Sequence, residues 1–72
     1  MTNYYTMNEL VLGNHYTAYV DQEDPIHVTY SHDIEDDGTT YPAFYRYDPE
    51  TKETHFEIVS FGNIEVKFMK ID

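Results

Sequence analysis

Polar and apolar side chains alternate along much of this chain with the period of two that is typical of β-strands. In residues 26–31 the side chains of Ile26, Val28 and Tyr30 point to one side of such a strand and the intervening polar ones to the other. The pattern predicts five strands, over residues 15–20, 26–31, 41–47, 53–60 and 64–71. Turn-forming residues recur at intervals of about ten residues, so we expect a mainly β fold, a small antiparallel meander that forms an open sheet or a partly open barrel.

The segments between the predicted strands are rich in Asp, Pro and Gly. They comprise an acidic loop over 21–25, a polar loop over 33–40 that ends in a Gly turn, a turn over 48–52 and a tight connection over 61–63. The turn over 48–52 is the strongest of these signals, because Pro49 fixes φ and Asp48 caps the turn. Pro42 has no backbone N–H, which predicts that its strand starts at a sheet edge or at a bulge.

A short helix is predicted before the first strand. Thr6 and Glu9 have the spacing of a capping box, in which the hydroxyl and the carboxylate satisfy free amides of a first helical turn. Gly13 stands where a C-cap glycine belongs, so the prediction is a helix of one or two turns over Met7–Leu12. A strand through the apolar residues 10–12 is the alternative that the pattern leaves open.

The chain of 72 residues is long enough for one domain, residues 1–72, with a small core and a thin margin of stability. Aromatic residues make up 17% of it, which favours a folded domain although the net charge is high. It has no cysteine, so no disulfide or thiolate metal site adds stability. A second subunit would supply further core, which makes a homodimer an alternative to a monomer.

No part of the sequence resembles a targeting or membrane-spanning segment. No basic region near residue 1 is followed by an apolar stretch, and the longest purely apolar run, residues 10–12, is far too short to cross a bilayer. The lack of cysteine fits a reducing compartment. We therefore expect a cytoplasmic protein, with no membrane among its partners.

Negative charge is concentrated in one part of the chain. The formal net charge is −10, and seven of the fourteen acidic residues fall between positions 21 and 37, where no Lys or Arg occurs. These seven are Asp21, Glu23, Asp24, Asp33, Glu35, Asp36 and Asp37. Like charges that lie close together oppose compaction, so their concentration in one segment needs an explanation.

Two interpretations of the acidic stretch stand side by side. Either its carboxylates form a solvated surface, or they mimic the phosphates of a nucleic acid and occupy the Lys- and Arg-lined cleft of a protein that binds it. The mimic requires carboxylates that are held on strands and tight turns. The strand over 26–31 separates the two acidic loops by up to ~20 Å, unless a bent sheet aligns them along one edge.

Metal binding is a weaker alternative for the same residues. Asp33, Glu35 and Asp37 occupy the first, third and fifth positions of an EF-hand-like loop whose sixth position is Gly38. Phe44 stands where an EF-hand needs a bidentate Glu, so only a weak surface Ca²⁺ site remains open. The four histidines, at positions 15, 27, 32 and 55, lie too far apart in sequence to argue for zinc. We assign no cofactor.

Tyrosine is the second unusual feature, with eight residues in a chain whose core is small. Tyr41, Tyr45 and Tyr47 share one face of the predicted third strand. They are candidate partner contacts, because tyrosine gives a large rigid contact area with a polar tip. The alternative is that tyrosine simply suits a half-buried sheet. We expect at least two of the eight to be exposed.

The sequence contains no catalytic signature. It has no cysteine nucleophile, no Ser in a Gly-rich elbow and no phosphate-cradling loop, so we do not expect an enzyme. In composition the chain resembles the small acidic inhibitors that bacteriophages and mobile elements direct against host DNA-binding systems, such as anti-CRISPR, anti-restriction and uracil-DNA glycosylase inhibitor proteins. The resemblance implies a basic nucleic-acid-binding protein of a bacterial host as partner, without direct contact to nucleic acid. The charge and tyrosine patterns make the seven acids and the three tyrosines the residues expected to bind it. The alternative is a small structural or assembly module with a solubilising acidic surface.

Overall fold

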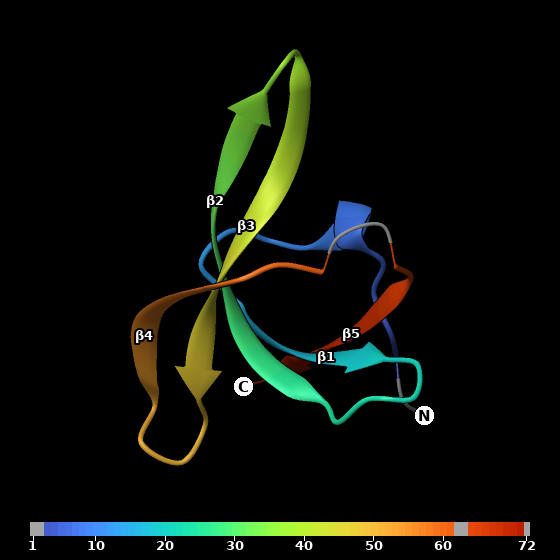
Figure 1. Cartoon of the computed structure of the whole chain (residues 1–72). Helices are drawn as coiled ribbons and strands as arrows, with labels where there is room; N and C mark the ends of the chain where they lie inside the picture. The colour runs from blue at the N-terminus through green and yellow to red at the C-terminus, as the bar shows by residue number, and fades with distance from the viewer. Residues whose placement is uncertain (1–2, 62–63, 72) are drawn as a thin grey trace.

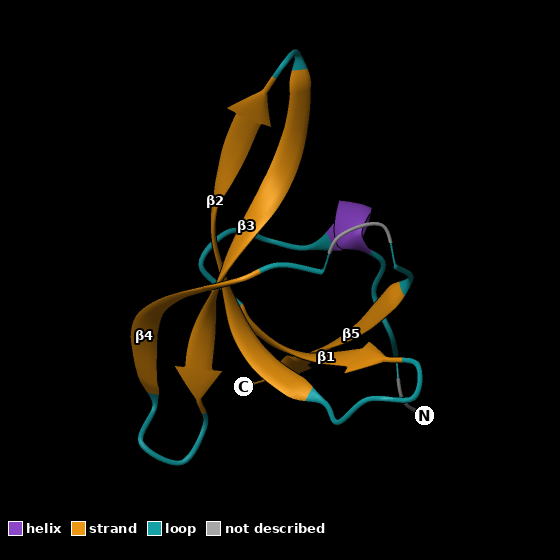
Figure 2. Ribbon diagram, viewed as in Figure 1, coloured by secondary structure: helices purple, strands orange, loops and turns teal. Residues whose placement is uncertain are grey.

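Five antiparallel strands in one open sheet make up the fold (Figure 1, Figure 2). The computed structural model of the chain describes residues 3–61 and 64–71. The strands are β1 (His15–Val20), β2 (Ile26–Asp36), β3 (Thr39–Asp48), β4 (Glu53–Val59) and β5 (Val66–Ile71), and a single 3-10 turn, η1 (Met7–Glu9), precedes them. The mainly β, antiparallel architecture predicted from the sequence is confirmed. Residues 62 and 63 of the predicted connection over 61–63 lie outside the described residues.

The strand order is β4-β3-β2-β1-β5, so β1 to β4 follow one another as a meander and β5 returns to the far side of β1. The pairing of β5 with β1 runs from His15 opposite Ile71 to Val20 opposite Val66. Tyr5 pairs with Phe68 on the outer side of β5, through a backbone hydrogen bond of 2.7 Å from the Tyr5 amide and one of 3.0 Å from the Phe68 amide. The segment before η1 thus covers part of the edge that β5 presents.

The core lies on one face of the sheet and is largely aromatic. Phe44 and Phe68 are almost completely buried and their rings stack, with centroids 5.4 Å apart and planes inclined by 20°. Phe61 meets both rings edge-on. Val28 and Tyr30, which the alternation places on one side of their strand, both belong to this core, as do Val66 and Phe68 of β5. Ile64 is half exposed, because β5 begins two residues later than predicted.

The opposite face carries a series of polar contacts. Nδ1 of His15 lies 2.8 Å from the Thr29 hydroxyl oxygen, which lies 3.1 Å from that of Thr54. The Thr17 hydroxyl oxygen lies 2.9 Å from Nδ1 of His27. These contacts satisfy the two buried threonines, and no buried side-chain nitrogen or oxygen in the described residues lacks a partner.

The helix predicted over Met7–Leu12 is reduced to the single turn η1. Its capping box forms, with the Glu9 carboxylate accepting hydrogen bonds from the Thr6 amide at 2.9 Å and from the Thr6 hydroxyl at 3.0 Å. Leu10 already has extended dihedral angles and packs against the core. The amide that follows donates to the Tyr16 hydroxyl at 2.9 Å. Tertiary contacts therefore replace helical hydrogen bonds, and the strand considered for the same apolar residues does not form either.

The polar loop predicted over residues 33–40 is instead the outer part of a long hairpin. β2 continues to Asp36, β3 begins at Thr39, and only Asp37 and Gly38 turn the chain, with φ of 52° and 79°. Two positive φ angles are what a two-residue type I′ turn needs, and this turn matches the twist of the strands that it joins. The prediction is wrong because acidic residues are rare in strands, whereas the Asp-Gly pair favours a tight hairpin.

The outer part of this hairpin stands clear of the rest of the sheet (Figure 1). β1 pairs with β2 as far as Thr29, and β4 pairs with β3 as far as Phe44. In the part of the chain that the structure describes, residues 32–36 and 39–43 therefore pair only with each other. The molecule is elongated as a result, with extents of 36 × 25 × 21 Å. β3 starts at Thr39, three residues before Pro42 and earlier than predicted. At Pro42 the described part of β3 pairs with β2 alone, which suits a residue without a backbone N–H.

A bulge at the base of the outer hairpin, residues 32–43, changes which residues of β2 face the core. Ser31 is an extra residue in β2 between Tyr30 and His32. The alternation reverses at this point, so that Asp33 rather than His32 follows Tyr30 on the core side. The bulge therefore brings Asp33, the first carboxylate of the outer hairpin, beside the core residue Tyr30.

The remaining elements agree with the sequence patterns. β1 has the predicted bounds, and β4 ends one residue earlier than predicted. In the turn over 48–52, the Asp48 carboxylate accepts a hydrogen bond of 2.9 Å from the Glu50 amide, and the Lys52 amide donates to the Asp48 carbonyl at 2.8 Å. The capping role predicted for Asp48 is thus confirmed.

Candidate functional site

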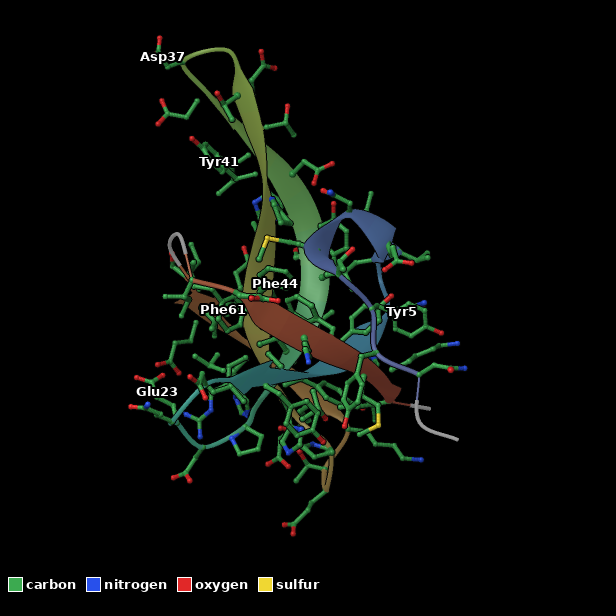
Figure 3. All side chains as sticks on the ribbon, turned by 90° about the vertical axis from the view of Figure 1, so that its right-hand side faces the viewer. Tyr5, Glu23, Asp37, Tyr41, Phe44 and Phe61 are labelled. Atoms are coloured by element: carbon green, nitrogen blue, oxygen red, sulfur yellow. The ribbon has the colours of Figure 1, made fainter. Side chains whose placement is uncertain are left out.

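The acidic hairpin, residues 32–43 of β2 and β3 with their turn, carries four of the seven clustered acids, all of them exposed. Asp33 and Glu35 lie on one face of it and Asp36 on the other, because side chains alternate along a strand. Asp37 stands at the tip (Figure 3). The residues opposite the strand carboxylates are uncharged: Pro42, Thr40 and Thr39. The hairpin therefore presents carboxylates on both faces and at its end.

Asp33 differs from the other three because it is tied to the core. The Tyr30 hydroxyl donates a hydrogen bond to the Asp33 carboxylate. This bond, together with burial of the Tyr30 ring, raises the pKa of Tyr30 to about 12. The contact joins the base of the hairpin to the aromatic core, so it fixes the direction in which the hairpin projects.

The other three clustered acids, Asp21, Glu23 and Asp24, lie at the opposite end of β2. They are exposed in the connection between β1 and β2. β2 has 11 residues, which corresponds to roughly 35 Å of strand between this connection and the hairpin turn. Figure 3 shows Asp37 at the top of the molecule and Glu23 far below it, at the left side. The acidic stretch thus forms two separate groups, and the alignment along one edge that the sequence left open does not occur.

Positive charge lies away from the acidic hairpin. Arg46 is the first basic residue of the chain, and its guanidinium lies 3.4 Å from the Glu57 carboxylate on β4. Both side chains are well exposed, so the pair adds little stability, but it offsets the charge of Arg46. Lys67 and Lys70 belong to β5, at the other edge of the sheet. Among the described residues, none of the four hairpin carboxylates forms a salt bridge with a Lys or Arg, so no ion pair offsets their negative field.

The three candidate tyrosines of β3 have different environments. Tyr47 is buried and its ring stacks on that of His15, with centroids 3.8 Å apart. It is therefore a structural residue, and its assignment to a partner surface is corrected. Tyr41 is 51% exposed, and Tyr45 is partly buried on the same face of the strand. The expectation of at least two exposed tyrosines is confirmed by Tyr4 and Tyr41.

Two exposed apolar residues of β4 adjoin this face. Phe56 is 88% exposed and Ile58 is 62% exposed. The Phe56 ring meets the Tyr45 ring edge-on at 5.5 Å, and Ile58 is the direct cross-strand partner of Tyr45. The alternation in the sequence places Phe56 and Ile58 on one side of β4, but it carries no signal that this side is open to solvent. The exposure of that side follows from the tertiary fold, which local pattern cannot give.

The carboxylates considered for calcium do not converge on a point. Asp33 and Glu35 lie along an extended strand and Asp37 lies in the turn, whereas an EF-hand loop wraps around its ion. Within residues 3–61 and 64–71, no three His, Cys, Asp or Glu side chains are placed to hold a metal ion. The geometry gives no support to the calcium and zinc alternatives.

Comparison of the chain with protein-family models, with curated proteins and with solved structures finds no match. Among the residues that the structure describes, no helix is long and apolar enough to cross a bilayer. The geometry and the charge of the acidic hairpin are therefore the features from which a function can be inferred.

Proposed function

We propose that this protein is a non-enzymatic binding protein whose acidic hairpin enters the basic cleft of a nucleic-acid-binding protein and takes the place of phosphates. One observation carries the proposal. Four carboxylates, those of Asp33, Glu35, Asp36 and Asp37, lie on a hairpin that projects from the sheet. The stretch from Asp21 to Tyr45, which includes the hairpin, contains no Lys or Arg.

The backbone of the hairpin supports phosphate mimicry over simple solubilisation. Carboxylates two residues apart on one face of a strand recur about every 7 Å, in a spacing that the backbone holds constant. A tight turn holds Asp37, and a hydrogen bond from Tyr30 holds Asp33. Proteins that bind nucleic acid align Lys and Arg with a regular array of negative charge. An array that is already ordered loses less entropy on entering such a cleft than a flexible acidic tail does.

The proposal extends to the class of target and to the setting. Small acidic inhibitors of this composition act for bacteriophages and mobile elements against anti-viral nucleases and other DNA-binding proteins of a bacterial host. We assign this chain to that kind of role, as an inhibitor in the host cytoplasm, for example against a CRISPR or restriction enzyme. The charge of −10 repels a phosphate backbone, so the expected partner is the basic protein and not the nucleic acid.

Two triple variants with the same net charge test the proposal. Glu35→Gln, Asp36→Asn and Asp37→Asn together neutralise the outer hairpin, whereas Asp21→Asn, Glu23→Gln and Asp24→Asn together neutralise the opposite end. Each set removes three negative charges, and both leave the Asp33 contact with Tyr30 intact. The tagged proteins are used to capture partners from a bacterial lysate, which are eluted with rising salt and identified by mass spectrometry.

The wild-type protein and the variant at the opposite end are expected to retain the same basic nucleic-acid-binding protein and to release it as salt rises. The hairpin variant is expected to lose it, because charge contacts in such clefts are strongly salt-dependent. Equal loss in both variants would mean that net charge, and not the hairpin, is responsible. Equal retention of the captured protein by both variants would contradict the proposal.

The second candidate is a small structural or assembly module, and the exposed apolar surface of β4 favours it. Phe56 and Ile58 together offer the kind of contact that forms the centre of a protein interface. A module of this kind would bind its partner with little dependence on salt. Capture that survives high salt and is unaffected in the hairpin triple variant identifies this alternative.

A further inference from the structure

An apolar strip runs beside the acidic hairpin on the face opposite the core. It consists of five side chains from three strands: Ile34, Tyr41, Tyr45, Phe56 and Ile58. The register establishes their common face, because Ile34 pairs with Tyr41 and Ile58 pairs with Tyr45. Tyr41 and Tyr45 are four residues apart on a regular strand, and the Phe56 ring contacts the Tyr45 ring. Four of the five side chains are more than 40% exposed.

A bulge in β4 brings Phe56 into this strip. Regular pairing holds on either side of it, with Ile58 opposite Tyr45 and His55 opposite Arg46, so that Phe56 and Glu57 are extra residues. Bulges on edge strands re-aim side chains and discourage pairing with further strands. The Glu57 carboxylate turns towards Arg46, whereas the Phe56 ring remains 88% exposed. A phenylalanine this exposed contributes little to the stability of the domain, which points to a contact outside it.

A hollow of about 350 Å³ adjoins the strip, between the base of the hairpin and the end of β4. Three of its lining residues belong to the strip, namely Ile34, Tyr41 and Ile58, and Asp36 also borders it. Phe44 and Phe61 of the core line it as well, so the hollow lies between the strip and the edge of the core. A hollow of this size can hold one large apolar side chain. The carboxylate at its border favours a positive charge next to that side chain in the sequence of the partner.

We propose that the apolar strip is the anchoring surface for the same basic partner, which inserts an apolar side chain flanked by Lys or Arg. The inference rests on the proposed function and adds the chemistry of the partner's contact surface. Charge complementarity identifies the occupant. Asp36 lies on the same face as Ile34, Asp37 stands at the hairpin tip beyond it, and Glu57 lies within β4, so a partner that covers the apolar residues must lie against carboxylates.

A second copy of this chain is the less suitable occupant. Each copy carries a formal charge of −10, so two copies repel one another. Like charges that face one another across an interface oppose association. A partner with Lys or Arg beside its apolar residue gains from the same carboxylates. The apolar contact and the charge contact therefore favour the same basic partner.

The test uses two labelled model peptides of equal length and equal positive charge, one alternating Arg and Leu and the other alternating Arg and Ser. Their dissociation constants for the wild-type protein are measured by fluorescence anisotropy over a range of salt concentrations. We expect the Arg/Leu peptide to bind about tenfold more tightly, the effect of one buried apolar anchor. We expect this ratio to persist as salt rises, because burial of apolar surface is not screened.

Three variants separate the two contributions. Phe56→Ser is expected to abolish the preference for the Arg/Leu peptide and to leave the salt dependence of peptide binding unchanged. The hairpin triple variant is expected to weaken the salt dependence of peptide binding and to keep the preference for the Arg/Leu peptide. Leu12→Ser is the matched control, because Leu12 is a 54% exposed apolar residue outside the strip. Circular dichroism verifies that each variant is folded, which the exposure of the substituted side chains favours.

The outcomes distinguish failure of this inference from failure of the proposed function. Salt-dependent binding that requires the hairpin charges but ignores Phe56→Ser overturns the anchoring strip and leaves the proposed function standing. Binding that ignores the hairpin charges overturns both. Sedimentation of the unliganded protein tests whether a second copy of the chain occupies the strip. A dimer that Phe56→Ser converts to a monomer would assign the strip to that second copy and overturn the inference.

Discussion

Replacing Tyr30 by phenylalanine tests how firmly the acidic hairpin is joined to the core. The Tyr30 ring is 9% exposed and lies 5.7 Å from the Phe44 ring, between centroids, and Tyr30→Phe keeps this packing. The substitution removes the hydroxyl that donates to the Asp33 carboxylate. Any change in stability therefore reports on one hydrogen bond at the base of the hairpin.

The size of the effect follows from the pKa of Tyr30. The hydrogen bond to Asp33, with burial of the ring, raises this pKa from 10.0 to about 12. One pKa unit corresponds to about 1.4 kcal/mol between the two protonation states, which sets an upper limit of about 3 kcal/mol on the stabilisation. Asp33 is exposed and water competes for its carboxylate. We therefore expect Tyr30→Phe to lower the free energy of unfolding by about 1 kcal/mol.

The difference between the two proteins should disappear at high pH. Below the ordinary pKa of 10.0, Tyr30 is protonated in both the folded and the unfolded chain, and the stabilisation is complete. Between that value and about 12 the unfolded chain loses this proton while the folded chain retains it, so the stability of the wild-type protein falls. Tyr30→Phe removes this proton, so the variant lacks this contribution to the fall.

Urea unfolding followed by circular dichroism, repeated from neutral pH to about pH 12, measures both quantities. Asp33→Asn is the control, because its side-chain oxygen still accepts the Tyr30 hydrogen bond but carries no charge. Asp33→Asn should retain part of the stabilisation that this hydrogen bond gives. Its free energy of unfolding should depend much less on pH in the alkaline range than that of the wild-type protein. Equal stability of wild type and Tyr30→Phe at neutral pH, or a difference that stays constant up to pH 12, would refute the reasoning.

Two further predictions concern the turns. Gly38→Ala places a side chain at φ 79°, where the added Cβ meets no atom within 4 Å, so the cost is one of backbone conformation alone, roughly 1 kcal/mol. Hydrogen exchange at the hairpin amides should accelerate about fivefold while exchange at Ala18 and Phe68 is unchanged, and equal acceleration at all of them would contradict a local effect. The Glu50 amide holds the pKa of Asp48 below its ordinary 3.8, so this contact stabilises the fold above that value and is lost as pH falls. Asp48→Asn should therefore make urea unfolding less sensitive to acid, and an unchanged acid dependence would argue against the capping role.

Local patterns predicted the strands whose residues alternate in the usual way, and they failed where charge or tertiary contacts dominate. The strand over 15–20 has its predicted bounds, because Tyr, Thr and Val favour a pleated strand whatever surrounds them. Residues 33–36 contain three carboxylates and were expected in a loop, although the structure continues β2 through them. The signal for the correct answer was the Asp-Gly pair at the turn, whose conformation suits a two-residue hairpin.

The candidate site was predictable in its residues and not in its arrangement. Composition alone identifies the acids, and the alternation identifies Tyr41, Tyr45 and Tyr47 as one face of a strand. Tyr47 is buried with its ring stacked against His15 of β1, a strand that β2 separates from β3 in the sheet. The separation of the two acidic groups depends on the full length of β2, which the sequence pattern underestimated. Both properties arise from contacts between distant segments, which local pattern does not encode.

The return of β5 to β1 has a consequence for the order in which the chain folds. β1 to β4 are joined by short turns, so their hairpins can form early from neighbouring residues. The pairing of His15 with Ile71 closes a loop that contains most of the chain, and such closure is entropically costly. Phe68, which completes the aromatic stack, arrives only with this step. Folding should therefore be limited by the docking of β5, and a substitution that weakens the pairing of β1 with β5 should slow refolding more than one in the acidic hairpin.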